Sequence, residues 1–388
     1  MDIAVIGGGI GGLAAAVALR RAGHEVTVYE QASRIGEVGA GFGLMPNGMR
    51  MMDRLGLGEA VARVGAPYLV DSTYFRADGE YVGQQTVTDS AGVYTSWGMH
   101  RADMIDVLLG ALPREIVRTG HRLEGLDERA DGVELRFEGG IAVRADLVVG
   151  ADGIRSAVRN AITEPAHPIP AGSNAYRGVV PMERLPGWRP NASQMWMGER
   201  SHFLTYPVRG GRLLNYVAFV PTEKELGESW SAVGDVESLR RDFADWAAPV
   251  EQVLAQVETT FWWGLYDREP LSRWSTDRVT ILGDAAHAML PHLGQGANQA
   301  IEDGISLAVL LRGVDADATA PALAAYERLR LGRTAEVQGG SRAYGKRYDS
   351  EYDDLSERDR EIRASRDFRL WLYDHDAEAE AEALAATR

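Results

Sequence analysis

Residues 2–30, with the sequence DIAVIGGGIGGLAAAVALRRAGHEVTVYE, decide the fold of this 388-residue chain. Asp2 to Ile6 is a short apolar run typical of a buried strand, and Ile10 to Ala22 is rich in Ala and Leu, as a helix packed on a sheet would be. His24 to Glu30 alternates apolar and polar side chains, which predicts a second strand. The chain therefore opens with strand, helix and strand, and we expect an α/β fold.

Three glycines between the first strand and the helix predict a nucleotide site. Gly7, Gly9 and Gly12 form a G-x-G-x-x-G: the first permits a tight turn, the second lets the backbone approach a pyrophosphate, and the third allows close helix–strand packing. The helix N-terminus adds free N–H groups and positive potential, and Glu30 would accept hydrogen bonds from ribose hydroxyls. This is a Rossmann-like cradle, and at this point NAD and FAD are both possible because they share it.

Charge and composition exclude several classes of function. Asp and Glu number 56 against 41 Lys and Arg, a net charge of −15, so we expect neither nucleic acid nor an anionic membrane as a partner. The chain has no cysteine, which excludes disulfides, cysteine nucleophiles and the dithiol chemistry of flavin reductases. Neither a signal sequence nor a run of 18 apolar residues is present, which predicts a cytoplasmic protein.

The rest of the chain predicts a sheet inserted into the first fold. Aromatic-rich, strand-like segments lie between Ala175 and Trp263, at Gln194 to Met197, His202 to Tyr206, Leu213 to Val220 and Phe261 to Trp263. A buried strand at Arg278 to Gly283 and a helix at Ala297 to Leu311 then resume the nucleotide-binding unit. The charged region after Arg312 is predicted to be helical, and its last residues, AEAEAEALAATR, read as a polar tail that frays.

We therefore expect three parts. A discontinuous dinucleotide-binding domain, which the family resemblance described below implies is FAD-binding, would comprise residues 1–75, 100–172 and 266–340. A substrate-binding β-sheet domain would comprise residues 76–99 and 173–265. Residues 341–388 would form C-terminal helices and the tail.

Further motifs carry a resemblance to a known family. Residues 150–159 read GADGIRSAVR and residues 283–303 read GDAAHAMLPHLGQGANQAIED; with GGGIGG they resemble the three fingerprints of the single-component FAD-dependent aromatic hydroxylases, which include p-hydroxybenzoate and salicylate hydroxylases. The likeness spans about residues 1–340. It also includes VGAGFGLMPNGMRMMDRLGL (38–57), HRADM (100–104), AYRG (175–178) and YDREPLSRW (266–274).

The resemblance implies non-covalent FAD, NADH or NADPH as a transient co-substrate, and O₂. Asp284 would accept a hydrogen bond from the ribityl chain, and the helix N-terminus at Gly294, Gly296 and Ala297 would face the flavin ring, where its dipole favours negative charge. The resemblance also assigns Arg34, Arg101 and Asp152 to cofactor binding. Two alternatives stay open: Asp152 as a turn-forming residue before Gly153, and Arg101 in a surface ion pair.

A hairpin in the inserted sheet supplies candidate substrate residues. Gly210-Gly211 is a two-residue turn signal, and its register places Tyr206 opposite Asn215, Leu204 opposite Val217 and His202 opposite Phe219 on one face. An apolar face with His, Tyr and Asn suits a small phenolic substrate.

The same stretch resembles salicylate and 3-hydroxybenzoate hydroxylases, and this resemblance makes His202 the base toward a substrate hydroxyl and Tyr206 a polar anchor, for instance to a carboxylate. Asn215, Val217, Pro291 and His292 join them as substrate contacts. The alternative is that His202 is a satisfied sheet histidine and Tyr206 a core residue.

We expect no metal site. His287 and His292 are separated across a proline-containing loop, no third imidazole is nearby, and the flavin motif already explains Asp284.

The resemblance implies a FAD-dependent, NAD(P)H-consuming monooxygenase that hydroxylates a small phenolic acid, similar to salicylate or a hydroxybenzoate, through a flavin C4a-hydroperoxide. Two alternatives remain: a tailoring monooxygenase acting on a polyketide, indole, nicotinate or urate-like ring, and a flavin-binding protein without oxygenation. The expected partner is the small aromatic substrate, with the enzyme a monomer or a homodimer.

Overall fold

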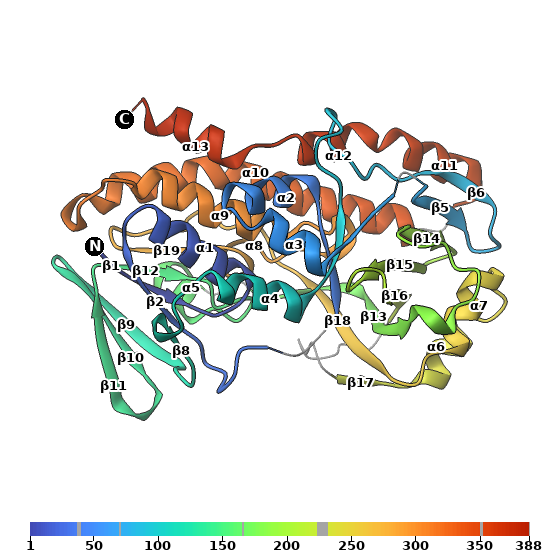
Figure 1. Cartoon of the computed structure of the whole chain (residues 1–388), viewed down its shortest axis with the longest axis horizontal. Coiled ribbons are helices and arrows are strands. Elements are labelled where there is room, and N and C mark those ends of the chain that lie inside the picture. Colours follow the sequence, from blue (N-terminus) through green and yellow to red (C-terminus); the bar gives the residue numbers. More distant parts are fainter. Residues whose placement is uncertain (37–39, 70, 165–166, 223–231, 350–351, 388) are drawn as a thin grey trace.

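The computed structural model describes residues 1–36, 40–69, 71–164, 167–222, 232–349 and 352–387. A parallel sheet lies at the end of the molecule that holds the N-terminus, and a larger sheet lies at the opposite end (Figure 1). One long helix, α10 (Thr319–Asp349), runs from the first part to the second over about 46 Å. In the part of the chain that the structure describes, no helix is both long enough and apolar enough to cross a membrane.

The N-terminal unit is a five-stranded parallel sheet, as the opening motif predicts. Its order is β19-β12-β1-β2-β8, with bounds β1 (Asp2–Ile6), β2 (Glu25–Tyr29), β8 (Val117–Arg118), β12 (Leu147–Gly150) and β19 (Val279–Ile281). Helix α1 (Ile10–Arg21) packs between this sheet and α9 (Gly296–Leu311). Because β19 comes late in the chain and pairs with β12, the nucleotide-binding unit does resume after the insertion, as predicted.

Shorter elements surround this unit. They include two three-stranded sheets, β11-β10-β9 and β3-β7-β4, and the helices α2 to α5. The strand bounds are β3 (Gly41–Leu44), β4 (Ala66–Pro67), β7 (Trp97–His100), β9 (Leu123–Arg129), β10 (Gly132–Phe137) and β11 (Ile141–Ala145). The helix bounds are α2 (Pro46–Arg54), α3 (Gly58–Val64), α4 (Arg101–Gly110) and α5 (Ala157–Ile162). Ser156 caps α5 by accepting the Arg159 N–H with its side chain.

The inserted sheet has eight strands in the order β17-β18-β13-β16-β15-β14-β5-β6, and its pairs are antiparallel except for β5 with β14. The strands are β5 (Thr73–Arg76), β6 (Tyr81–Gln84), β13 (Ile169–Pro181), β14 (Gln194–Met197), β15 (His202–Val208), β16 (Leu213–Pro221), β17 (Ala232–Gly234) and β18 (Thr260–Asp267). The predicted hairpin register is confirmed in full, because Gly210 and Gly211 both adopt the positive φ that the tight turn requires.

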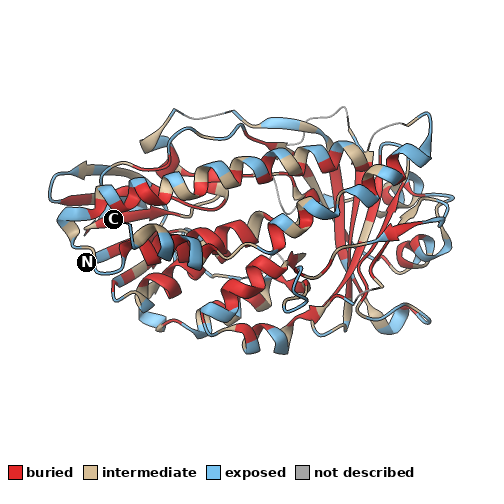
Figure 2. Cartoon of the chain, turned by 90° about the horizontal axis from the view of Figure 1, so that it is seen from above, coloured by how far each residue is buried: buried red, intermediate tan, exposed pale blue. Residues whose placement is uncertain are grey.

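Alternation along the strands gives this sheet two different faces. Phe203 and Tyr216 point to one face, which α6 (Val236–Asp242) and α7 (Ala248–Ala255) cover with Leu239, Val250 and other apolar residues. Tyr206 and Val217 point to the opposite face, toward the interior of the molecule. Figure 2 shows that buried residues run from the parallel sheet through α9 to this large sheet.

The C-terminal region is helical, as predicted, but its end is not a frayed tail. It comprises α10, α11 (Leu355–Ala364), α12 (Arg366–Tyr373) and α13 (Ala377–Ala385). In α13, Ala377 and Ala381 lie four residues apart on one helix face and are fully buried against α9. The prediction of fraying was wrong because the Ala–Glu repeat creates a narrow apolar stripe that packs on α9.

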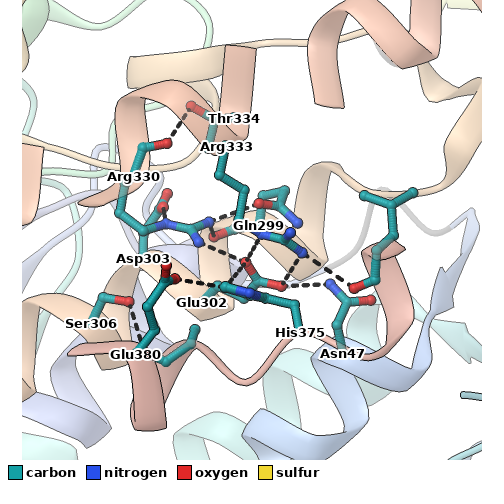
Figure 3. Close-up of polar contacts among 12 residues, drawn as sticks. Asn47, Gln299, Glu302, Asp303, Ser306, Arg330, Arg333, Thr334, His375 and Glu380 are labelled. Atoms are coloured by element: carbon teal, nitrogen blue, oxygen red, sulfur yellow. Dashed lines mark hydrogen bonds and ion pairs between the residues drawn. The ribbon is translucent and has the colours of Figure 1, made fainter. Parts of the chain in front are cut away.

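A buried ionic network joins α10 to α9 and α2 (Figure 3). Arg330 of α10 donates to Glu302 and Asp303 of α9, each at 2.7 Å, and all three side chains are almost fully inaccessible to solvent. Glu302 also receives hydrogen bonds from Arg333 at 3.1 Å and from Asn47 of α2 at 2.7 Å. Burial raises the pKa of Glu302, but the two arginines outweigh it and hold the carboxyl ionised.

Arg330→Met is expected to destabilise the protein by about 3–5 kcal/mol, because two buried carboxylates lose the cation that they share and keep only Arg333 and His287 as charged or chargeable neighbours at hydrogen-bond distance. Urea unfolding of the purified protein measures this change. The matched control is Arg312→Met, which removes a cation from the exposed pair with Glu382 at 3.6 Å and should change stability by less than about 0.5 kcal/mol. Equal effects of the two substitutions would contradict a structural role for the network.

Candidate active site

The three glycines of the opening motif form a tight cradle. Gly7 has φ +112°, and a Cβ there would lie 2.3 Å from the carbonyl oxygen of Ala151. A Cβ on Gly12 would lie 2.1 Å from the carbonyl oxygen of Gly7, so any side chain would push α1 away from β1. At Gly9 the nearest atom would be 3.9 Å away, on the Arg101 guanidinium, which leaves the side of the loop that would face a pyrophosphate open.

The acidic residue after β2 supports this loop from the side. Glu30 accepts the N–H of Gly8 at 2.7 Å with one carboxylate oxygen and the N–H of Ala32 at 2.8 Å with the other. Each oxygen keeps a further lone pair, so ribose hydroxyls can still be bound. Arg101 begins α4 and lines the cavity described below, whereas Arg34 is exposed on the loop after β2 and does not line it.

The middle motif has a structural role in this chain. Asp152 accepts hydrogen bonds from the Ser156 hydroxyl at 2.5 Å and from the N–H groups of Ala157 and Val158 at 2.7 and 3.2 Å. These contacts fix the first turn of α5. Asp152 is not among the residues that line the cavity described below, and its role in cofactor binding stays a prediction. Arg159 is buried beneath the motif and donates to the Ile154 carbonyl at 2.9 Å.

The third motif places an acidic residue beside a helix N-terminus. Asp284 follows β19 and lines the cavity, and its Oδ1 would be 3.9 Å from a Cβ on Gly296, the first residue of α9. Gly294, Gly296 and Ala297 line the cavity with it. The Gly283 N–H donates to Asp303 at 2.9 Å, so the buried network that holds Arg330 also fixes the turn that presents Asp284.

One continuous cavity connects this cradle with the inner face of the large sheet. On the cofactor side it is lined by Ile10, Arg101, Asp284 and the start of α9, and on the sheet side by Tyr206, Val217, Phe219, Trp263 and other residues of six strands. The start of β3 (Gly41–Gly43) and the 3₁₀ turn Pro291–Leu293 also line it. A dinucleotide and an aromatic ring bound in this cavity would therefore be neighbours.

The predicted substrate residues divide into two groups. Tyr206, Val217, Pro291 and His292 line the cavity. Asn215 does not: its Oδ1 accepts the Gly41 N–H at 2.8 Å, so it holds β3 against the hairpin. Burial raises the pKa of Tyr206, which keeps its phenol protonated as a hydrogen-bond donor at neutral pH.

His202 also lies outside the cavity lining. It is buried, its ring stacks on Phe219 with centroids 4.0 Å apart, and its Nδ1 lies 2.5 Å from Oδ1 of Asp349 at the end of α10. The pair is only partly shielded, because the side chain of Asp349 is 18% exposed. His202 faces the cavity side of the sheet, as the register predicts, but Phe219 and His292 stand next to it on the cavity wall.

His292 is the histidine on the cavity wall. Its ring centroid is 5.4 Å from that of His202, and a Cβ on Gly345 of α10 would lie 2.6 Å from its Nε2. Burial, with a smaller contribution from His202, lowers the pKa of His292 to about 3, so its ring is neutral at physiological pH. His287, which the sequence places near it, instead bonds Asp303 at 2.6 Å, and the described residues contain no cluster of three potential metal ligands.

Sequence reasoning missed three buried residues of the site. Asn298, in the first turn of α9, donates to the carbonyls of Gly43 and Gly294 and accepts the Met45 N–H. It therefore holds β3 and the 3₁₀ turn Pro291–Leu293 together on the cavity wall. Arg177 of β13 and Arg369 of α12 also line the cavity. Asn298 lies inside the third motif and Arg177 inside AYRG (175–178), so both could have been found there, whereas nothing local to Arg369 marks it as buried.

These features define a flavin-dependent enzyme, and comparison with known proteins agrees. The family model described as "FAD binding domain" matches residues 1–339, so the chain belongs to this family. Its curated relatives are named as monooxygenases, and the protein is a FAD-dependent aromatic-ring monooxygenase.

Particular relatives cover nearly the whole chain. A 3-amino-4-hydroxybenzoate 2-monooxygenase of Streptomyces platensis is 39% identical over 97% of this chain and 96% of the relative. A salicylate hydroxylase of Pseudomonas putida is 36% identical over 99% of this chain and 95% of the relative. The solved structure of a salicylate hydroxylase substrate complex matches with a TM-score of 0.85 and 31% identity, covering 99% of this chain and 98% of that one.

The residues present fit FAD. The open side of Gly9 leaves room for the pyrophosphate, Glu30 keeps free lone pairs, and Asp284 stands where α9 presents its N-terminus. Residues 38 and 39 of the motif at 38–57 lie outside the described residues.

The steric difference between two glycines of the cradle gives a test. Gly12→Ala should lower the stability of the apoprotein by about 1–3 kcal/mol and abolish tight FAD binding, because the added Cβ collides with Gly7. Gly9→Ala should leave apoprotein stability unchanged and weaken FAD binding alone, since its Cβ points into open space. Urea unfolding and FAD titration separate the two effects. The control is Gly332→Ala in α10, which should leave FAD binding unchanged and raise stability by about 0.5–1 kcal/mol. Equal stability losses at Gly9 and Gly12 would refute this assignment.

The lowered pKa of His292 makes folding pH-dependent. Below about pH 6.5 the unfolded chain binds a proton that the folded protein excludes down to about pH 3, so stability falls as the pH decreases through this window. Between pH 7 and pH 5 the wild type should lose about 2 kcal/mol more than His292→Gln. Urea unfolding at the two pH values gives the comparison, and parallel losses would show that His292 titrates normally in the folded state.

Proposed function

We propose that this enzyme hydroxylates a small phenolic carboxylic acid at the expense of NADH or NADPH. The observation that carries the proposal is the single cavity that runs from the glycine cradle to the aromatic inner face of the large sheet. The relatives named for 3-amino-4-hydroxybenzoate and salicylate support this substrate class. FAD supplies the redox chemistry and the activation of O₂ when it is bound.

The chain's own residues bind, orient and shield the substrate. Val217, Phe219 and Trp263 provide apolar walls, and Tyr206 donates a hydrogen bond from a phenol that burial keeps neutral. Pro291 and His292 hold the substrate against the side of the cavity where α9 begins. These apolar walls exclude water from the reacting atoms.

In this proposal, two histidines that lie one behind the other carry the acid–base chemistry. His292, neutral and on the cavity wall, accepts a hydrogen bond from the substrate hydroxyl, and His202 with Asp349 lies directly behind it. His202 therefore acts at one remove from the substrate, and its contact with Asp349 fixes the orientation of its ring. The partial exposure of Asp349 gives this pair contact with solvent protons.

His202→Ala should lower the rate of hydroxylation by at least about 100-fold with FAD content unchanged, because the histidine pair loses its link to Asp349. Product formation by the FAD-loaded enzyme with 3-amino-4-hydroxybenzoate and salicylate measures this rate. The control is His121→Ala, since His121 lies outside the cavity lining beside Tyr29. Unchanged turnover in His202→Ala would assign His202 to packing on Phe219.

The substrate class is tested by NADH and NADPH oxidation across phenolic acids, hydroxynicotinate, urate and indoles, with product analysis. We expect a phenolic acid to stimulate oxidation most and to yield a hydroxylated product. Stimulation by a larger or nitrogen-containing ring alone would refute the proposal, and peroxide without any hydroxylated product would indicate a flavoprotein that does not oxygenate.

A further inference from the structure

Arg369 is a buried cation on the wall of the cavity. It lies in α12, is only 8% exposed, and lines the cavity together with Tyr373 of the same helix and Tyr74 of β5. Arg369 and Tyr373 lie beyond residue 339, where the match to the FAD-binding family model ends.

The neighbours of Arg369 are phenols. Its Nη2 donates to the Tyr348 hydroxyl at 2.9 Å, its Nη1 lies 3.3 Å from the Tyr373 hydroxyl, and its guanidinium carbon is 5.1 Å from the ring centroid of Tyr344. Its Nε is buried and has no hydrogen-bond partner. Within the described residues, no carboxylate lies within ion-pair distance of this guanidinium.

The surrounding tyrosines do not neutralise the charge. Burial raises the pKa of Tyr74 and of Tyr348, so both phenols stay protonated at neutral pH and contribute dipoles rather than negative charge. A guanidinium buried without a counter-ion is unfavourable by several kcal/mol, and one N–H left without an acceptor adds to this penalty. An anion bound in the cavity would supply the missing counter-ion, and a carboxylate matches the donor geometry of arginine.

We propose that Arg369 binds the carboxylate of the aromatic acid and selects acids over neutral phenols. This inference rests on the proposed function and names its specificity-determining residue. Arg177, the other buried arginine of the cavity, is on β13, four strand positions from the Tyr74 strand β5. Arg177 packs over Trp263 and close to Tyr206, at the opposite side of the sheet face. The carboxylate is therefore held between the sheet and α12, and Tyr206 serves the ring rather than the carboxylate.

The test compares an acid with its carboxamide, which has the same shape without the charge. The FAD-loaded enzyme is assayed with 3-amino-4-hydroxybenzoate, or whichever acid of the panel has the highest kcat/KM, and with the matching amide. Arg369→Met should raise the KM and the dissociation constant of the acid by about 30-fold or more and change those of the amide less than about threefold. Arg369→Lys should recover part of the acid binding, because the charge remains but the planar donor pair is lost.

Stability measurements separate anchoring from a structural role. Arg369→Met removes an uncompensated buried charge, so the holoenzyme without substrate should keep or raise its melting temperature. The acid should raise the melting temperature of the wild type but not of this variant. The matched control is Arg366→Met, which removes the same charge from an exposed position of the same helix and should leave acid and amide kinetics unchanged.

Two results would overturn the proposal. One is an acid-to-amide preference that survives in Arg369→Met, and the other is a preference lost in Arg177→Met and kept in Arg369→Met. Failure of the proposed function is distinguishable, because the wild type would then show no stimulated hydroxylation of any phenolic acid.

Discussion

The pairing of Arg330 with Asp303 and Glu302 is the interaction on which the site depends most widely. Asp303 fixes the Gly283 turn and so the position of Asp284, while Glu302 joins α9 to α2 through Asn47. The same contacts set the direction of α10. Because that helix is 31 residues long, its far end delivers Tyr344, Tyr348 and Asp349 to the large sheet. One buried network therefore aligns the cofactor side and the substrate side of a single cavity.

Local chemistry made most of the fold predictable. The glycine cradle imposes its own turn, and the hairpin register follows from the Gly210-Gly211 turn, since a slip of one residue would invert both faces of the sheet. The α/β class and the late return of the chain to the parallel sheet were also predicted from the local sequence patterns of strands and helices. The packing of the C-terminal helix α13 could not be predicted locally, because the burial of Ala377 and Ala381 depends on α9, which is far away in the sequence.

The site was predictable only where its contacts are local. Tyr206 and Val217 point into the cavity as the strand alternation requires. The partner of His202 is 147 residues away, and only the path of α10 brings Asp349 to it. Arg369 lies in SERDREIRASRDFRLW (356–371), a charged segment that looks like a solvated helix. Periodicity alone does not show which of its arginines faces the interior, because the residues that bury one face of α12 belong to β5 and α10.

The overall charge of −15 disfavours the approach of an anionic substrate, so an acid must be attracted by local charge. In water a compact positive patch would be screened within about 10 Å. A guanidinium surrounded by neutral phenols is screened much less, and its attraction for a carboxylate acts mainly after the ring has entered the cavity. Selection of the acid then depends on the bound state rather than on the rate of encounter. The same buried charge disfavours the empty cavity and favours the filled one, which links substrate binding to the packing of α12 against the sheet.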